Sequence, residues 1–219
     1  MITVPEAAKT IIKRSRYLTE AMSKGFINNS SLARYMKPEI EEMLLKKVNE
    51  SSIIMAINRL QKNLKPQSKY KNIFKTAPDM ITRSNLVEIN IKNSKNLIEK
   101  YSSLLTLSQS QKESFLTITT GAFETTIIFS RDLYPDIKKL VSQEDVVDEF
   151  HDLCSITVRL PKEAIITPGV FYFFLKSLAW ESVNIIEIVS AYRELTFIVD
   201  RKDTNKAFSI LQSLFPQNT

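Results

Sequence analysis

The first third of the chain carries apolar residues at the spacing of amphipathic helices. A helix is predicted from Pro5 to Lys24, because apolar or small side chains fall on one face and charged ones on the other. Gly25 follows at the position that glycine favours just beyond a helix C-terminus. Asn29 or Ser30 is the expected N-cap of a second helix, and Pro38 either kinks that helix or opens a new one. The apolar or small face of the first helix comprises Ala8, Ile11, Ile12, Ser15, Leu18 and Met22.

A third helix is predicted over 49–64, and it is followed by a boundary region over 66–80. The helix turns Asn58, Arg59 and Lys62 outward, and its inward residues are Ile53, Ile54, Ile57, Leu60 and Leu64. The first domain therefore covers 1–65. The lysines that follow fit either an amphipathic helix or one arm of a wing hairpin, and periodicity does not decide between them: Lys65, Lys69, Lys71 and Lys75.

Beyond residue 80, one order of elements occurs twice. Strand, helix, hairpin and helix patterns fall at 83–91, 94–105, 113–130 and 132–141, and then at 153–160, 168–183, 184–200 and 201–215. Matching landmarks such as Phe123 and Tyr192 lie about 70 positions apart, which indicates an internal duplication. Each copy, 81–150 and 151–219, has the order of a ferredoxin-like α+β unit, with helices on one face of an antiparallel sheet.

The segment 166–185 of the second copy combines a Pro-Gly helix start with a strongly apolar helix. Pro168 suits the first helical turn, with Thr167 as the cap before it. Gly169 has no side chain, so a ligand could approach the free N–H groups of that turn, which favour an anion such as a carboxylate. Asn184 offers a donor and an acceptor to a small polar ligand. The alternative is structural: Pro-Gly is also simply a good helix start, and Asn184 a turn residue.

The stretch 155–215 resembles the regulatory ACT domain of aspartate kinases. The resemblance rests on the Pro-Gly helix start, the Asn-Ile pair entering the next strand, the Ser-Ala-x-x-Glu turn of 190–194 and the "FIVDRKD" exit. It covers about 60 residues well, and 80–150 more weakly as a preceding copy. It implies two tandem βαββαβ ACT units. The second copy ends without an obvious fourth strand, which the first copy or a partner is expected to supply.

The resemblance also implies an amino-acid effector site at a homodimer interface. Its residues would be the helix-start backbone around Thr167, Pro168, Gly169 and Val170, the amide of Asn184 with Ile185, and Glu163 for side-chain selectivity. The first copy has "NSKN" at 93–96 where the second has "TPGV" at 167–170, so its site is expected to be degenerate. The catalytic domain of the kinases and its glycine-rich loops are missing from the sequence, so no kinase activity is expected.

Charge divides the chain in the same way as the helical pattern. Residues 1–75 hold 15 Lys/Arg and 6 Asp/Glu, whereas residues 76–219 hold 15 and 18, so the basic excess belongs to the first third. The "SLARYM" and "SSIIMAINRL" pair resembles a helix-turn-helix, whose second helix enters the major groove. The alternatives are a bundle whose lysines are only solvated, or a dimerisation element. The candidate DNA contacts are Ser51, Ser52, Asn58, Arg59 and Lys62.

Several classes of site do not fit the composition. Three isolated glycines are too few for a phosphate loop or a dinucleotide fingerprint. A single cysteine, Cys154, excludes an internal disulfide and a multi-cysteine zinc site, and Cys154 with His151 is expected to be structural rather than catalytic. We expect no enzyme activity, metal or cofactor. The sequence has no apolar run of about 18 residues and no signal-peptide pattern, so a cytoplasmic protein without membrane contact is expected.

Together these features predict an amino-acid-responsive regulator. The first hypothesis is a homodimeric DNA-binding transcriptional regulator whose ACT units sense an effector. The alternative is a free-standing regulatory subunit, like that of aspartate kinase, which binds an amino acid and docks on a biosynthetic enzyme without binding DNA.

Overall fold

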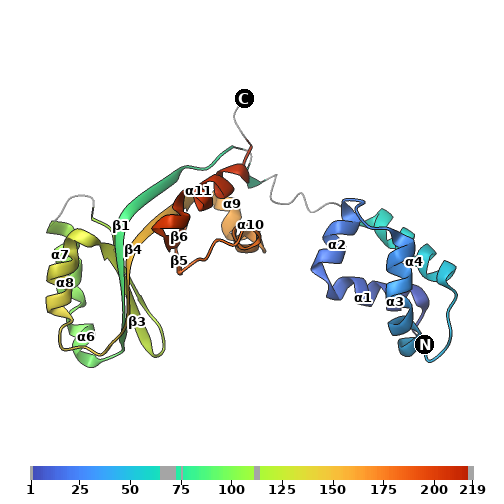
Figure 1. The fold of residues 1–219 in the computed structure, drawn as a ribbon, viewed down its shortest axis with the longest axis horizontal. Coiled ribbons are helices and arrows are strands. Elements are labelled where there is room, and N and C mark those ends of the chain that lie inside the picture. The colour runs from blue at the N-terminus through green and yellow to red at the C-terminus, as the bar shows by residue number, and fades with distance from the viewer. Residues whose placement is uncertain (1, 65–72, 75, 111–113, 217–219) are drawn as a thin grey trace. The chain divides into compact units, whose positions relative to one another are not determined.

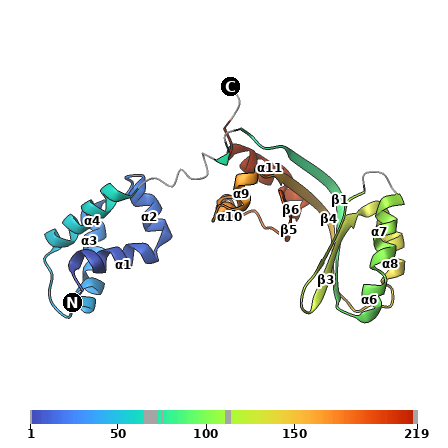
Figure 2. The same cartoon turned by 180° about the vertical axis from the view of Figure 1, so that it is seen from behind.

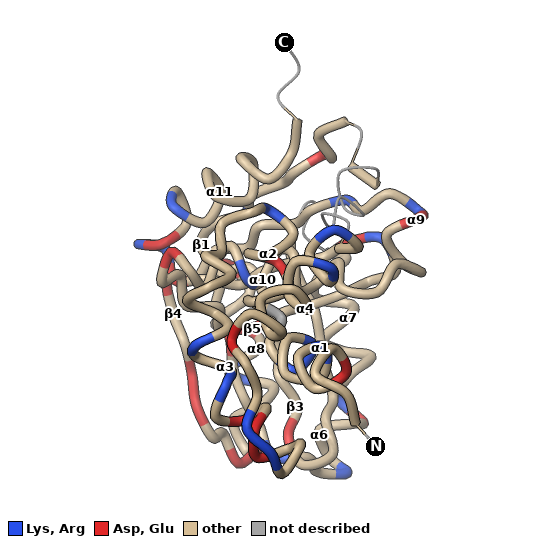
Figure 3. Tube along the Cα trace, turned by 90° about the vertical axis from the view of Figure 1, so that its right-hand side faces the viewer, with Lys and Arg blue, Asp and Glu red and all other residues tan. Residues whose placement is uncertain are grey.

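The computed structural model describes residues 2–64, 73–74, 76–110 and 114–216. The chain divides into two compact units, Met1–Asn72 and Ile73–Thr219 (Figures 1 and 2). Figure 3 marks the charged positions along both units. Lys65, Lys69, Lys71 and Lys75 lie outside the described residues, so neither interpretation of that segment, helix or wing arm, is tested here.

The described part of the first unit contains four helices rather than the predicted three. They are α1 (Val4–Arg14), α2 (Arg16–Ser23), α3 (Asn29–Leu44) and α4 (Glu50–Asn63). The predicted first helix is interrupted at Ser15, which has extended backbone angles (φ −105°, ψ 107°). The Ser15 hydroxyl accepts a hydrogen bond from the N–H of Leu18 at 3.3 Å. Ser15 is therefore the N-cap of α2 and not a residue of one long helix face.

The N-cap of α3 lies one residue before the predicted position. The Asn28 side chain accepts hydrogen bonds from the N–H groups of Ser30 and Ser31, both at 3.0 Å. The helix then runs through Pro38 to Leu44 without a second helix opening at the proline.

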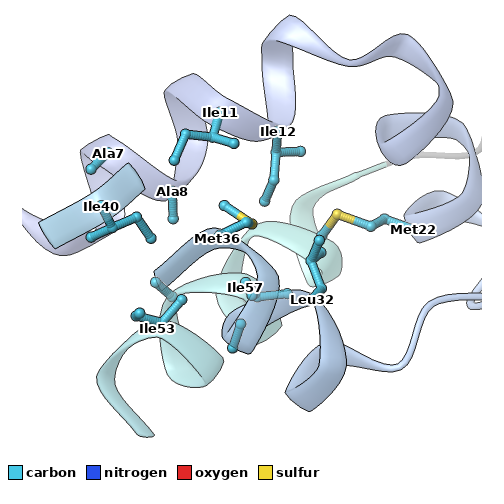
Figure 4. Packing of buried hydrophobic residues seen from close by; sticks show 12 residues of the cluster. Ala7, Ala8, Ile11, Ile12, Met22, Leu32, Met36, Ile40, Ile53 and Ile57 are labelled. Carbon is cyan, nitrogen blue, oxygen red and sulfur yellow. The ribbon is translucent and has the colours of Figure 1, made fainter. Parts of the chain in front are cut away.

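The four helices enclose one apolar core (Figure 4). Ile53 and Ile57 of α4 are fully buried, and Leu60 and Leu64 pack against the core from its edge, which confirms the predicted inward face of this helix. The buried residues of the core are Ala7, Ala8, Ile11, Ile12, Met22, Leu32, Ala33, Met36, Ile40, Ile53, Ala56 and Ile57.

The second unit is built on one six-stranded antiparallel sheet of order β2-β3-β1-β4-β6-β5. The strand, helix, hairpin and helix order occurs twice, as the pattern predicts. The strands are β1 (Met80–Lys92), β2 (Leu116–Thr120), β3 (Glu124–Ser130), β4 (Val146–Arg159), β5 (Glu187–Ala191) and β6 (Glu194–Asp200). The helices are α6 (Lys95–Glu99), α7 (Tyr101–Ser110), η1 (Arg131–Leu133), α8 (Tyr134–Leu140), α9 (Lys162–Ile165), α10 (Val170–Trp180), η2 (Arg201–Asp203) and α11 (Thr204–Ser213).

The two copies share this sheet through their long first strands, β1 and β4. In β1, Leu86–Lys92 pairs with β3 of its own copy, whereas Met80–Arg83 pairs with the half of β4 that belongs to the second copy. In β4, Leu153–Arg159 pairs with β6, and the preceding half pairs with β1. Each copy therefore supplies the fourth strand of the other. The missing strand of the second copy comes from the same chain, and the copies form one continuous sheet rather than two separate tandem units.

Both long strands bulge where they pass from one copy to the other. Asn85 and Asp152 have left-handed backbone angles, with φ of 58° and 55°. These residue types tolerate that conformation because their short polar side chains adapt to it. The bulges precede Leu86 and Leu153, which pair with each other and are buried with Ile128 on the sheet face opposite the first copy's helices. Each bulge thus changes the direction of its strand at the point where the strand passes from one copy to the other.

Aromatic rings fill the core beneath α10 and α11. Phe174 of α10 is fully buried, and its ring centroid lies 5.9 Å from that of Phe197 on β6. Phe74 belongs to the same core, with ring centroids 5.7 Å from Phe174 and 5.0 Å from Phe215. Phe74, which precedes β1 in the chain, is therefore already part of the core of the second unit.

An ion pair fixes the helix start of the first copy. Lys100 Nζ lies 2.5 Å from Glu144 Oε1, and the Glu144 side chain is only 3% exposed. The Ser94 hydroxyl donates to Glu144 Oε2 at 2.6 Å and accepts the N–H of Leu97. Hydrogen bonds from Lys100 and Ser94 hold the pKa of Glu144 below its ordinary value of 4.5.

The bulge at Asn85 predicts a difference between two substitutions. Asn85→Val should lower the free energy of unfolding by about 1–2 kcal/mol, because a β-branched residue is strained at positive φ. Asn85→Gly should leave it within about 0.5 kcal/mol of wild type, because glycine adopts this conformation freely. Urea unfolding of both variants measures the difference. Equal stabilities would contradict the assigned backbone conformation.

The Lys100–Glu144 pair predicts a pH-dependent loss of stability. Lys100→Met should lower the free energy of unfolding by about 1–3 kcal/mol at pH 7, because a buried carboxylate loses its charged partner. Since the folded pKa of Glu144 is lowered, the stabilisation is present above pH 4.5 and is lost as the pH falls below that value. The difference between wild type and variant should therefore shrink below pH 4.5 in urea titrations. The exposed Lys139→Met is the control, and an equal effect of that substitution would refute the role of the pair.

Candidate functional site

A hollow of about 370 Å³ lies in the second copy, where α9, the start of α10 and the β5–β6 hairpin meet. Three of its residues, Thr167, Gly169 and Val170, belong to the site expected from the sequence. The full lining consists of Leu160, Ala164, Ile165, Thr167, Gly169, Val170, Phe171, Ser190 and Tyr192.

The helix at this hollow begins later than predicted. Gly169 is its N-cap with φ 90°, and α10 starts at Val170, so Pro168 precedes the helix instead of occupying its first turn. Glycine suits this position because φ 90° is unfavourable for residues with a Cβ. Thr167 does not cap α10. Its hydroxyl donates to the carbonyl of Glu163 at 2.7 Å, so it closes the end of α9.

The start of α10 presents unbonded N–H groups. The N–H of Phe173 donates to the carbonyl of Gly169 at 3.0 Å, which is the first bond of the helix. The N–H groups of Val170, Phe171 and Tyr172 have no hydrogen-bond acceptor within the described residues. Val170 and Phe171 also line the hollow. Because the N-terminal end of a helix carries partial positive charge, this wall of the hollow favours a negatively charged group.

The opposite wall is held by the β5–β6 turn. Leu160, just beyond β4, donates its N–H to the carbonyl of Arg193 at 2.6 Å, and Arg193 Nε donates to the Leu160 carbonyl at 2.9 Å. Tyr192 precedes Arg193 in this two-residue turn, with φ 51° and 71% of its surface exposed. These two hydrogen bonds between Arg193 and Leu160 fix the turn, so Tyr192 and Ser190 are held beside the hollow.

The other expected site residues lie outside the lining. Asn184 is exposed and Ile185 is half-buried in the extended segment between α10 and β5. Glu163 is exposed on α9, and Pro168 is exposed in the turn before α10. The structure therefore gathers the helix-start residues and leaves these four at the surface around it.

Sequence reasoning missed the residues that complete the hollow. Leu160, Phe171, Ser190 and Tyr192 come from three elements, and only the hairpin register brings them together. The hairpin turn itself was visible as a Ser-Ala-x-x-Glu motif, but the contact of Arg193 with Leu160 was not. This contact joins segments 33 positions apart.

At the corresponding place in the first copy, polar side chains bind to other groups of the protein. By element order α6 corresponds to α9 and α7 to α10, so the single residue Lys100 stands where the second copy has Ile166–Gly169. The expected match of 93–96 with 167–170 therefore does not hold. Lys100 is bound to Glu144, and the Asn93 side chain donates to the carbonyl of Gly121 at 2.9 Å.

Most candidate DNA contacts lie on the surface of α4. Ser51, Arg59 and Lys62 are exposed and Ser52 is half-buried. Asn58 is exposed, but its Oδ1 accepts a hydrogen bond from Asn29 of α3 at 2.6 Å. Among the described basic side chains of the unit, Arg14, Lys24, Arg34 and Lys37 form ion pairs with glutamates. Within the described residues no ion pair is formed by Lys9, Lys13, Lys46, Lys47, Arg59 or Lys62.

Cys154 and His151 do not form a nucleophile–base pair. Cys154 is buried in the core, whereas His151 Nε2 lies 2.8 Å from Glu149 Oε1. Across the described ranges, no group of His, Cys, Asp and Glu is arranged to bind a metal ion. A search of the same ranges finds no helix with the length and apolar character needed to span a bilayer.

No protein-family model and no curated protein matches the chain. Among solved structures, aspartate kinase from Clostridium acetobutylicum matches with a TM-score of 0.53 at 16% identity, covering 64% of this chain and 35% of the kinase. The regulatory subunit of aspartate kinase from Thermus flavus matches with a TM-score of 0.51 at 10% identity, covering 64% of this chain and 100% of the subunit. Aspartate kinase from Synechocystis matches with a TM-score of 0.50 at 15% identity, covering 65% and 28%.

These similarities concern the fold and a part of the chain. The chain spans about a third of the length of the Clostridium acetobutylicum enzyme. Only the second unit, Ile73–Thr219, is long enough to supply a match over 64% of the chain. The second unit therefore has the fold of a regulatory subunit of aspartate kinase.

Proposed function

We propose that the chain is an amino-acid-responsive regulatory protein whose effector binds in the hollow at Gly169. The observation that carries the proposal is the meeting of unbonded N–H groups of α10 with an apolar wall in a hollow of about 370 Å³. The fold shared with a regulatory subunit of aspartate kinase supports a regulatory role.

The geometry suits the polar end of an amino acid. The effector's carboxylate lies against the N–H groups of Val170 and Phe171, where the helix dipole stabilises negative charge. The hydroxyl of Ser190 provides an acceptor for the ammonium group. No catalytic residue enters this proposal, because binding alone is sufficient for regulation.

A second copy of the chain completes the site in this proposal. The face of α10 that carries Tyr172 and Trp180 has exposed aromatic surface, with Tyr172 37% and Trp180 64% exposed. Homodimers formed through this face bring Asn184 and Ile185 toward the effector, while Glu163 and Pro168 stay exposed outside the lining of the hollow. An effector that binds one dimer arrangement more tightly than another shifts the population toward it.

The regulator acts either by binding DNA through its first unit or by docking on a partner enzyme. The basic excess of the first third and the exposed Arg59 and Lys62 of α4 support duplex DNA binding by the α4 surface, with Ser51, Ser52, Asn58, Arg59 and Lys62 as contacts. Docking on a biosynthetic enzyme is the second candidate. It is favoured by the existence of the same fold as a separate regulatory subunit in Thermus flavus.

The effector proposal predicts a thermal shift. Among the twenty amino acids, at least one should raise the unfolding temperature by about 5–10 °C at a hundred times its Kd, because it binds only the folded state. Ser190→Trp should abolish the shift by filling the hollow, and Ser209→Trp on the exposed face of α11 should retain it. Asn184→Ala should reduce the shift. No shift with any amino acid would contradict the proposal.

The DNA proposal predicts a salt-dependent affinity. Wild type should bind duplex DNA with an affinity that falls steeply as salt rises, and Arg59→Glu with Lys62→Glu should remove binding. Lys95→Glu with Lys139→Glu in the second unit makes the same change in net charge and should leave binding intact. Fluorescence anisotropy at several salt concentrations measures both. If wild type does not bind at low salt and instead copurifies with an enzyme, the docking alternative is correct.

A further inference from the structure

The side chains that line the hollow carry no charge at neutral pH. The nine lining residues are four aliphatic residues or alanine, two aromatic residues, Thr167, Ser190 and Gly169, and Tyr192 contributes both a ring and a hydroxyl. We infer, on the basis of the proposed function, that the effector is an α-amino acid with a neutral and predominantly apolar side chain.

The nearest charged side chains along the chain are engaged or placed elsewhere. Arg193 does not line the hollow, and its Nε donates to the carbonyl of Leu160. Glu163 is exposed on α9 and is also outside the lining. A ligand ammonium or carboxylate beyond the α-carbon would therefore lose its hydration without gaining an opposite charge, which is strongly unfavourable.

The aromatic rings of α10 that bind a cation, those of Tyr172 and Trp180, lie on its surface and not in the hollow. Lys176 Nζ lies 4.4 Å from the ring centroid of Trp180 and 5.7 Å from that of Tyr172, and both rings are outside the lining. Phe171 and Tyr192 instead face the hollow together with Leu160 and Ile165. This combination offers contact surface to an aliphatic or thioether chain.

The size of the hollow fits a ligand of this kind. A volume of about 370 Å³ is at the small end of ligand sites, which commonly range over roughly 300–1,000 Å³. The hollow accommodates an amino acid with several side-chain carbons. Each methylene that it buries should tighten binding about fourfold. The first copy differs in its chemistry as well, since Lys100 and Glu144 place a charged pair at the corresponding position.

A homologous series tests the inference on the full chain. L-Alanine, L-2-aminobutyrate, L-norvaline and L-norleucine should bind with affinities that rise about fourfold per added methylene, measured by calorimetry. L-Lysine has the carbon chain of norleucine with a terminal ammonium, and it should bind at least about tenfold more weakly than norleucine. A flat series, or lysine binding as tightly as norleucine, would overturn the inference while leaving the proposed amino-acid site intact.

A negative charge introduced into the hollow by substitution should reverse the preference for norleucine over lysine. Ser190→Asp adds a carboxylate to the lining, so lysine should gain affinity and norleucine should lose it. Ser209→Asp, on an exposed face of α11, should change neither. An unchanged preference in a folded Ser190→Asp variant would overturn the inference, and if that variant does not fold, the wild-type series decides. Failure of every neutral and charged amino acid to bind would overturn the proposed function itself.

Discussion

The second unit depends on the antiparallel pairing of β1 with β4. Each of these strands is long enough to serve two copies, so the hydrogen bonds between them close the sheet of both copies at once. Buried leucines from the two strands, Leu86 and Leu153, meet at the centre of this pairing. A copy separated from its neighbour would expose an unpaired strand edge, which is unfavourable in water. The duplication is therefore a structural requirement and not two independent domains in series.

The candidate site follows from where β4 ends. Leu160 is the first residue beyond the strand, and its two hydrogen bonds with Arg193 fix the β5–β6 turn beside the start of α10. The extra residues Ile166–Gly169 then separate α9 from α10 and leave a hollow. In the first copy, Lys100 alone joins the two helices and binds Glu144. The same scaffold thus holds an ion pair in the first copy and a hollow in the second.

The sequence predicted the elements of the second unit better than their connections. Alternation and helical periodicity are local, so the twofold order of strands and helices and the inward face of α4 were visible in advance. The first half of β4 was missed because its residues are mostly exposed and three of the seven are acidic, and its strand conformation depends on pairing with β1. The break at Ser15 was missed because a serine fits both the polar edge of a helix and a cap.

In the candidate site too, local features were predicted from the sequence and long-range contacts were not. Gly169 was proposed from Pro-Gly chemistry, and Thr167 and Val170 from the resemblance to the ACT domain, although the helix begins after Pro168. Tyr192 and Leu160 were not identified, because their proximity depends on strand register and on the side chain of Arg193. Residues that meet through long-range contacts leave no periodic signal in the sequence.

Backbone amide NMR during titration with norleucine tests the central claim most directly. The account predicts that the amide resonances of Val170 and Phe171 shift with a single saturating curve, while those of Lys100 and Tyr101 at the corresponding place in the first copy remain unchanged. Resonances at Val170 and Phe171 that do not move, while others elsewhere do, would contradict it.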